Sequence, residues 1–460
     1  MSEKTDLWGH PKGLYVLFFT EMWERFSYYG MRAILVLYLV ARETGDNPGL
    51  GWSDPEALKL YGWYTMLVYV MSIPGGWIAD NLIGQKKSVL YGGILLVMGH
   101  SILAVEEMWA FYSGLGLIIA GVGMLKPNIS TMVGGLYKQE DIRRDKGFTI
   151  FYIGINIGAF LSSLIVGYVG EVHGWHYGFG LAGIGMAAGL IQYLLGQKHL
   201  ANVGNLLGAS QDPAEIEAKK RPLTKIEKDR VVVLFISFLL VIVFWGAFEQ
   251  AGGLMNIYAK DKTARMLMGW EVPATWFQSL NAMFIIFLGT SVAAYWARRK
   301  LKGLLSTGLF KMIMGLVIMG AGFFFMTAAS AEYESTGSSA MYWLVLAYLF
   351  HTVGELCISP VALSYITKLS PVKYGSIMMG VYFAMTGFGN KLAGLLGASA
   401  EALGEFTIFT GIAVFCVVFG LLVLLFRKKL EQLTHGAEDN ERDLHHEEAE
   451  GFELADRENI

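Results

Sequence analysis

Apolar stretches long enough to cross a bilayer recur along this 460-residue chain, and they constrain its fold more than any other feature. A helix of about 20 residues spans the hydrocarbon core of a membrane and satisfies its own backbone hydrogen bonds there. The composition agrees, since 54% of the residues are hydrophobic and only 16% are charged. We therefore predict an all-α membrane protein that crosses the bilayer several times.

Twelve candidate spans can be delimited in the sequence. They cover residues 14–40, 59–80, 88–105, 109–135, 147–170, 177–197, 231–259, 274–297, 306–328, 341–367, 376–398 and 406–426. Most lysines and arginines outside these spans lie in alternate loops, on the same side of the membrane as the N-terminus. Cytoplasmic loops carry such an excess of positive charge. The distribution therefore predicts an even number of spans with both termini in the cytoplasm.

The longest internal loop divides the spans into two groups of six. We expect an N-terminal six-helix bundle over 1–197, a polar and basic cytoplasmic linker over 198–230, and a C-terminal six-helix bundle over 231–429. The tail over 430–460 is rich in Glu and Asp and is predicted to be disordered in the cytoplasm. Transporters built from two such halves bind substrate between them near the midplane.

The first span contains charges that lipid would penalise. Residues 21–30 read Glu-Met-Trp-Glu-Arg-Phe-Ser-Tyr-Tyr-Gly, and Arg32 follows. On a helix, Glu21, Arg25 and Arg32 fall on one face together with both tyrosines. Each charge near the bilayer centre costs about 2.5–3.5 kcal/mol on insertion scales. A self-contained ion-pair network explains this face poorly, because Arg32 has no acidic residue one turn away on its own helix. We therefore expect the face to border water or a ligand.

Later spans add polar side chains at membrane depth, namely Lys126, Asn156, Glu249, Asn281 and Glu355. A lone asparagine in a span more often makes a packing hydrogen bond than a ligand contact. Among the charged residues inside the spans named so far, all the cations belong to the first half of the chain, whereas Glu249 and Glu355 belong to the second. A cavity between the halves would thus have a positive and a negative wall, which suits a zwitterion. The four acids exceed the three cations by one. A desolvated carboxylate without a cationic partner can take up a proton, which indicates proton coupling.

Five segments match one known family in order along the chain. They are Glu21-x-x-Glu24-Arg25-Phe26-x-Tyr28-Tyr29-Gly30, Phe151-Tyr152-x-x-Ile155-Asn156-x-Gly158, Phe244-Trp245 with Glu249-Gln250, Phe277-Gln278-Ser279-Leu280-Asn281, and Gly354-Glu355-Leu356-x-Ile358-Ser359-Pro360. The chain resembles the proton-dependent oligopeptide transporters, a branch of the major facilitator superfamily, over all twelve spans. This resemblance implies the major facilitator fold and a bacterial symporter that imports di- and tripeptides with protons by alternating access.

The resemblance also implies roles for individual residues. Proton coupling would involve Glu21, Glu24, Arg25 and Glu249. Substrate binding would use Arg25 and Lys126 at the peptide carboxylate, Glu355 at its amino group, Asn156 and Asn281 at its backbone, and Tyr29, Tyr69, Trp245, Ser359 and Tyr382 around its side chains. Arg32 and Glu249 would form a salt bridge between the halves that helps to close the outer gate.

Three residues leave questions open. His351 lies one turn before Glu355 and either joins the coupling or packs between helices. Lys391 either has a role in the site or extends to the outer interface. Tyr382 stands where related proteins often carry Trp, which leaves the side-chain preference of the pocket undetermined. Many bacterial members insert two extra helices between the halves, but the loop 198–230 is too short and too charged for them.

Other functions remain as alternatives. The nearer one is a related transporter of another small anion or zwitterion, such as nitrate or an amino-acid conjugate. An enzyme would require a nucleophile–base or metal constellation, and we find none; Cys357 and Cys416 both lie in apolar stretches. We expect no cofactor, because the proton gradient would drive transport. The expected partners are di- and tripeptides, protons and the lipid of the bacterial inner membrane, with no nucleic acid.

Overall fold

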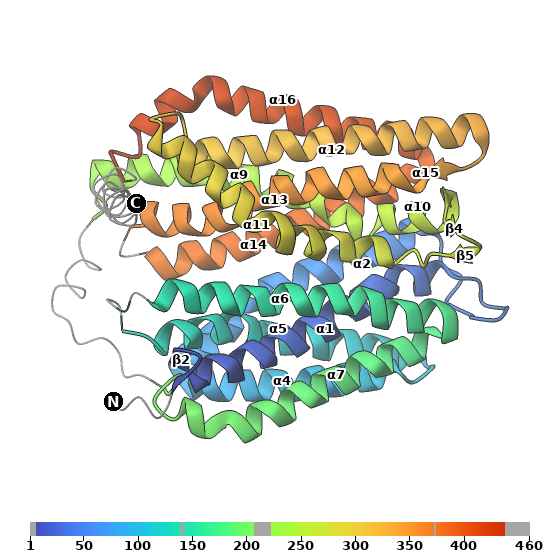
Figure 1. Ribbon diagram of the computed structural model, residues 1–460, viewed down its shortest axis with the longest axis horizontal. Helices are drawn as coiled ribbons and strands as arrows, with labels where there is room; N and C mark the ends of the chain where they lie inside the picture. Colours follow the sequence, from blue (N-terminus) through green and yellow to red (C-terminus); the bar gives the residue numbers. More distant parts are fainter. Residues whose placement is uncertain (1–5, 139–140, 142, 207–221, 372–373, 438–460) are drawn as a thin grey trace, which may run out of the picture.

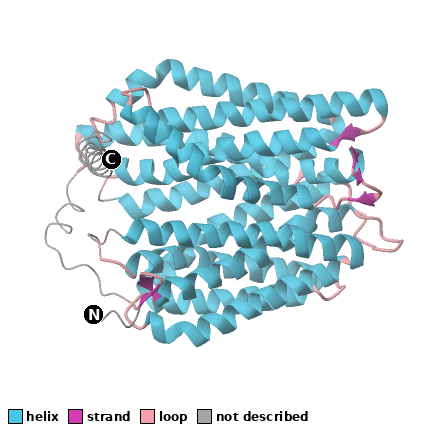
Figure 2. Cartoon of the chain, in the orientation of Figure 1, coloured by secondary structure: helices cyan, strands magenta, loops and turns pink. Residues whose placement is uncertain are grey.

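Long helices lying side by side make up almost the whole molecule (Figure 2). The computed structural model describes residues 6–138, 141, 143–206, 222–371 and 374–437. The helices form two groups that follow the order of the sequence, with α1 to α7 in the lower part of Figure 1 and α9 to α16 in the upper part. The described chain therefore has the all-helical, two-bundle architecture expected of the major facilitator fold.

The first bundle, here the N bundle, contains six spans. They are α1 (Lys12–Val40), α2 (Asp54–Val70) continued by α3 (Ser72–Ile78) and the π-helix η2 (Ala79–Ile83), α4 (Gln85–Leu103), α5 (Met108–Gly135), α6 (Arg143–Tyr168) continued by the π-helix η3 (Val169–His173), and α7 (Trp175–Gly196) followed by the 3₁₀-helix η4 (Gln197–Leu200).

The second bundle, here the C bundle, contains the other six. They are α9 (Lys225–Phe248) continued by the 3₁₀-helix η5 (Glu249–Ala251) and α10 (Leu254–Lys262), α11 (Trp276–Leu301), α12 (Gly308–Thr336), α13 (Met341–Leu369), α14 (Gly375–Ala398), and α16 (Glu405–Gln432) after the short α15 (Ala400–Leu403).

The strands of the described chain are two-residue pairs in the connections. β1 (Asp6–Leu7) pairs antiparallel with β2 (His10–Pro11), β3 (Thr263–Ala264) pairs parallel with β6 (Ser339–Ala340), and β4 (Met266–Leu267) pairs antiparallel with β5 (Trp270–Glu271). The connections that carry β3 to β6 lie at the end of the molecule opposite the start of α1 and the end of α16 (Figure 1). We call that end the distal end and the other the proximal end.

Nine helical segments of the described residues are long and apolar enough to cross a membrane by length and composition alone. Helices α1, α4 and α14 complete the twelve spans. Length and composition alone do not identify α1 as a span, because four charged residues interrupt its apolar sequence. The described residues therefore contain twelve long helical segments in two groups of six, the number of spans that the sequence predicts.

Several helix boundaries in the structure differ from those predicted from the sequence. Helix α2 begins at Asp54, five residues before the predicted start at 59, because Ser53 and Glu56 form a capping box there. Helix α9 begins at Lys225, inside the predicted linker, behind a second capping box of Thr224 and Glu227. Helix α16 continues to Gln432, so the first residues of the predicted tail are helical. The linker residues 207–221 and the tail residues 438–460 lie outside the described residues.

The predicted span 231–259 is not one continuous helix. It ends as an α-helix at Phe248, passes through η5, and resumes at Leu254. Gly252 and Gly253 form the break, and a Cβ at Gly252 would lie only 2.0 Å from the hydroxyl of Tyr61. The break therefore lets α2 approach the backbone of the C bundle at this level.

Helices α2 and α14 bring the backbones of the two bundles close together. A Cβ at Gly394 would lie 2.5 Å from the carbonyl oxygen of Leu58, and one at Gly62 would lie 3.0 Å from the Cα of Gly394. Small residues permit such backbone approach between membrane helices. Helix α6 packs against α11 in the same way, through Gly167 against Thr275.

Candidate functional site

The charged face of α1 is buried in the N bundle. The Nε atom of Arg25 lies 2.9 Å from Oε1 of Glu21 and 2.5 Å from Oε2 of Glu24. All three side chains are at most 4% exposed. Within the described residues, Nη2 of Arg25 and Oε1 of Glu24 have no hydrogen-bond partner. Buried polar atoms are normally paired, so this cluster has capacity left for a proton or a ligand.

Tyrosine rings connect this cluster to the neighbouring cations. The ring of Tyr29 has the guanidinium carbon of Arg25 at 5.7 Å from its centroid and that of Arg32 at 4.7 Å. The ammonium of Lys126, on α5, lies 3.7 Å from the ring centroid of Tyr69, on α2. These distances are within the range of cation–π contacts. Among the described residues Lys126 forms no ion pair, so its charge is available to an anionic ligand group.

An ion pair joins the two bundles near the distal end. Nη1 of Arg32 donates to both carboxylate oxygens of Glu249, at 2.9 and 3.1 Å. The hydroxyl of Tyr61 donates to Oε2 of the same carboxylate at 2.9 Å. Glu249 begins the η5 turn, immediately before the glycine break that faces Tyr61. Tyr61 is not among the residues predicted from the sequence, although the adjacent glycines at 252 and 253 are a signal that a side chain approaches here.

Glu355 is held within the C bundle. Asn281, on α11, donates its side-chain amide to Oε2 of Glu355 at 2.7 Å and to the hydroxyl of Thr352 at 3.1 Å. The two residues predicted to contact the amino group and the backbone of a peptide are thus bonded to each other. Asn156 donates to the carbonyl oxygen of Tyr152 on its own helix at 2.9 Å. Thr352 is not among the residues predicted from the sequence, because a threonine within a span carries no intrinsic signal of a site.

The remaining predicted lining residues are distributed over three helices. Trp245 packs edge-on against Phe248, with ring centroids 5.1 Å apart. Tyr382 is buried on α14. The hydroxyl oxygen of Ser359 is buried on α13 without a hydrogen-bond partner in the described chain. These three residues remain predicted substrate contacts.

Packing accounts for two of the three residues that the sequence left open, His351 and Lys391. The His351 ring lies 4.4 Å from that of Phe323, at an interplanar angle of 31°, and its Nε2 has no hydrogen-bond partner among the described residues. The ammonium of Lys391 lies 4.0 Å from the ring centroid of Trp63, which is 51% exposed. His351 therefore packs between helices, and Lys391 covers an exposed aromatic side chain.

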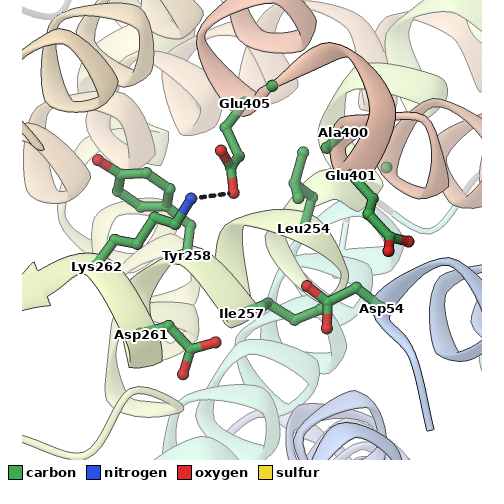
Figure 3. A pocket seen from close by; sticks show the side chains of 11 residues that line it. Asp54, Leu254, Ile257, Tyr258, Asp261, Lys262, Ala400, Glu401 and Glu405 are labelled. Atoms are coloured by element: carbon green, nitrogen blue, oxygen red, sulfur yellow. Dashed lines mark hydrogen bonds and ion pairs between the residues drawn. The ribbon is translucent and has the colours of Figure 1, made fainter. Parts of the chain in front are cut away.

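A pocket of about 320 Å³ opens at the distal end between α2, α10, α15 and α16 (Figure 3). Its carboxylates are Asp54 from the N bundle and Asp261, Glu401 and Glu405 from the C bundle. Lys262 pairs with Glu405 at 2.5 Å, as the dashed line in Figure 3 marks. None of the predicted substrate residues lines this pocket. In the described part of the chain, no group of three or more His, Cys, Asp or Glu is arranged to hold a metal ion.

Comparison with protein families identifies the chain. The model of the POT family matches residues 86–209 and 207–405. The chain belongs to the POT family. The resemblance to the proton-dependent oligopeptide transporters is thereby confirmed, and this POT family member is a transporter rather than an enzyme.

Relatives of this POT family member support the same assignment. A di-/tripeptide transporter of Lactococcus lactis subsp. cremoris is 34% identical over 94% of this chain and 98% of its own length. A crystal structure of a peptide transporter POT in complex with sulfate has a TM-score of 0.86 at 34% identity, covering 93% of this chain and 96% of that one. A second POT family transporter, in complex with a thioalcohol conjugated peptide, has a TM-score of 0.85 at 31% identity, with 93% and 98% coverage.

Proposed function

We propose that this protein imports di- and tripeptides together with protons across the bacterial inner membrane by alternating access. The observation that carries this proposal is the separation of charge between the bundles. Arg25 and Lys126 belong to the N bundle, while Glu355 belongs to the C bundle and is oriented by Asn281. A peptide has a carboxylate at one end and an ammonium at the other, so it complements both walls. Family membership and the named activity of the Lactococcus relative support the same substrate class.

Proton coupling follows from the ion cluster of α1. Two carboxylates, Glu21 and Glu24, share the single guanidinium of Arg25. When a peptide carboxylate also binds Arg25, it adds a third negative group to the cluster. Uptake of one proton by Glu24 or Glu21 removes the excess charge. Peptide binding and proton uptake would thus favour each other.

The pair of Arg32 and Glu249 would act as the gate. We assign the distal end to the outside of the cell and both termini to the cytoplasm, as the distribution of lysine and arginine in the loops indicates. On this assignment, the pair would hold the outer side closed. Tyr29 contacts both Arg25 and Arg32, so a change at the coupling cluster reaches the gate through one side chain.

Transport by purified protein in proteoliposomes tests the proposal. We expect uptake of labelled dialanine when the external side is more acidic, and little uptake when a protonophore abolishes the gradient. Unlabelled di- and tripeptides should compete, whereas nitrate and single amino-acid conjugates should not. Gradient-driven uptake of nitrate or of a conjugate, without competition by dialanine, would instead establish the alternative substrate.

A further inference from the structure

Helix α11 lacks a cap from its own sequence, and the other bundle supplies one. Its N-cap residue Thr275 makes no capping hydrogen bond with its side chain. The backbone N–H of Thr275 donates to Oε1 of Glu171 at 2.8 Å, and that of Ala274 donates to Oε2 at 3.1 Å. Glu171 belongs to η3 of the N bundle, 104 positions earlier in the sequence. One carboxylate therefore satisfies two backbone donors across the boundary between the bundles.

The N bundle holds Glu171 in place for this contact. Asn47, in the connection between α1 and α2, donates to the carbonyl oxygens of Gly170 at 2.8 Å and Glu171 at 3.1 Å. Its side-chain oxygen accepts the N–H of Trp175 at 3.2 Å. The π-helical turn that carries Glu171 is thus fixed on both sides before it meets α11.

Groups around the start of α11 favour the negative charge of Glu171 there. The N–H groups of residues 276–278 bond to the carbonyl oxygens of residues 273–275, so the donors that Glu171 satisfies are those of Ala274 and Thr275 just before them. The helix dipole favours a negative charge at this end. The ammonium of Lys260, from α10, lies 4.7 Å from the ring centroid of Trp175. The indole N–H of Trp276 donates to the carbonyl oxygen of Leu164 at 3.1 Å. The carboxylate of Glu171 therefore lies at the positive end of α11, and the charge of Lys260 on α10 also interacts with it.

The same helix carries a predicted substrate residue. Asn281 follows Thr275 by six positions, about 9 Å along the helix axis, and bonds to Glu355. The start of α11 can be capped by Glu171 only while the distal ends of the bundles are together. Opening of that end would leave the two N–H groups to water and release the start of α11.

We propose that Glu171 is a positioning residue of the distal gate, which stabilises the closed distal end by capping α11 and sets the position of that helix. It acts beside the Arg32–Glu249 pair, through the α6–α11 contact rather than through α1 and α9. This inference rests on the proposed alternating access, but its contacts are independent of the substrate.

Spin-label distances in the peptide-free protein test the inference. One labelled pair, Thr44→Cys with Met268→Cys, reports the distal end from exposed positions of the two bundles. A second pair, Lys87→Cys with Thr367→Cys, reports the proximal end. The native Cys357 and Cys416 are buried and free. Each pair is measured in the otherwise unchanged protein and with Glu171→Gln or Glu171→Ala.

We expect Glu171→Ala to lengthen the distal distance and to shorten the proximal one. The ratio of closed to open distal ends should fall on the order of 3- to 30-fold, as expected for loss of a helix cap. Glu171→Gln, which keeps one acceptor but no charge, should have a smaller effect. Glu334→Gln, at an exposed position near the distal end of α12, serves as the matched control and should change neither distance.

Unchanged distances with Glu171→Ala would overturn the inference, and so would equal broadening of both pairs, because that would indicate a purely structural role. Gly167→Ala gives a second, independent test. Its Cβ would lie 2.3 Å from the hydroxyl of Thr275 and should push α6 away from α11. We expect the distal spin-label distance to lengthen and the proximal one to shorten, as with Glu171→Ala. Because no peptide is present, these results do not depend on which substrate the protein carries.

Discussion

Arg32 and Glu249 lie 217 positions apart in the sequence, and the guanidinium of one donates to both carboxylate oxygens of the other between the two bundles. Neither residue has an oppositely charged partner on its own helix at this site. The pair therefore exists only while α1 and the end of α9 are together, which is the property that a gate requires.

Removal of one member of the Arg32–Glu249 pair should strongly reduce peptide uptake. Arg32→Ala leaves the buried carboxylate of Glu249 with only the Tyr61 hydroxyl, and breaking a buried pair in this way costs about 3–5 kcal/mol. We expect proton-driven dialanine uptake to fall more than tenfold. Tyr61→Phe removes one hydrogen bond to a charged group, about 1.5–3 kcal/mol, and should reduce uptake less. Initial uptake rates in proteoliposomes check this order, and a reversed order would contradict the gate assignment.

Lys126 should determine affinity for the peptide carboxylate. Its ammonium contacts the Tyr69 ring but forms no ion pair among the described residues, so Lys126→Gln should weaken dialanine binding roughly ten- to hundredfold, the loss of one charge-assisted hydrogen bond. Isothermal titration measures this change. The control is Lys391→Gln, which also removes a cation from an aromatic ring, at the exposed Trp63. Equal loss of affinity in both variants would argue against a specific role of Lys126.

Glu355 should recognise the amino group of the peptide. The unchanged protein is expected to bind dialanine much more tightly than N-acetyl-dialanine, because acetylation removes the positive charge. Glu355→Gln should reduce this discrimination, and Asn281→Ala should do so partially, since it leaves the carboxylate without its 2.7 Å donor. Competition of both peptides against labelled substrate measures the ratio. Undiminished discrimination in Glu355→Gln would assign the amino group to another residue.

Replacement of Glu24 should abolish proton-driven uptake but leave peptide exchange intact. Its Oε1 lacks a hydrogen-bond partner in the described chain, while its Oε2 faces Nε of Arg25, and Glu24→Gln mimics its protonated form. We expect this variant to lose uptake driven by a pH gradient while it retains peptide counterflow, which needs no net proton movement. Parallel driven-uptake and counterflow assays check this, with Glu334→Gln as control. Full gradient-driven uptake by Glu24→Gln would exclude this carboxylate from coupling.

The close contact of α2 and α14 should depend on Gly394. A methyl group there would lie 2.5 Å from the carbonyl oxygen of Leu58, and overpacking of this kind costs about 1–3 kcal/mol. Gly394→Ala should therefore lower the melting temperature in detergent and reduce uptake. Gly411→Ala, on α16, is the matched control, because no atom lies within 4 Å of the added methyl. Similar melting temperatures for the two variants would show that the helices can separate at little cost.

The sequence by itself determined the class of structure and the chemistry of the predicted site. Hydrophobic length predicts the spans, and alternating charge in the loops predicts their orientation, because the bilayer imposes both requirements on the chain. The cost of burying charge singles out Arg25, Lys126 and Glu355 without any knowledge of the fold. Helix periodicity places the charged residues of the first span on one face.

The tertiary structure decided which of these residues meet. Tyr61 on Glu249, Thr352 beside Asn281 and Glu171 at the start of α11 are contacts between helices distant in sequence. A single sequence contains no period or spacing for such contacts, since they depend on how two bundles are packed together. The same reason explains why the break at Gly252 was missed: its function is to admit a side chain from another helix.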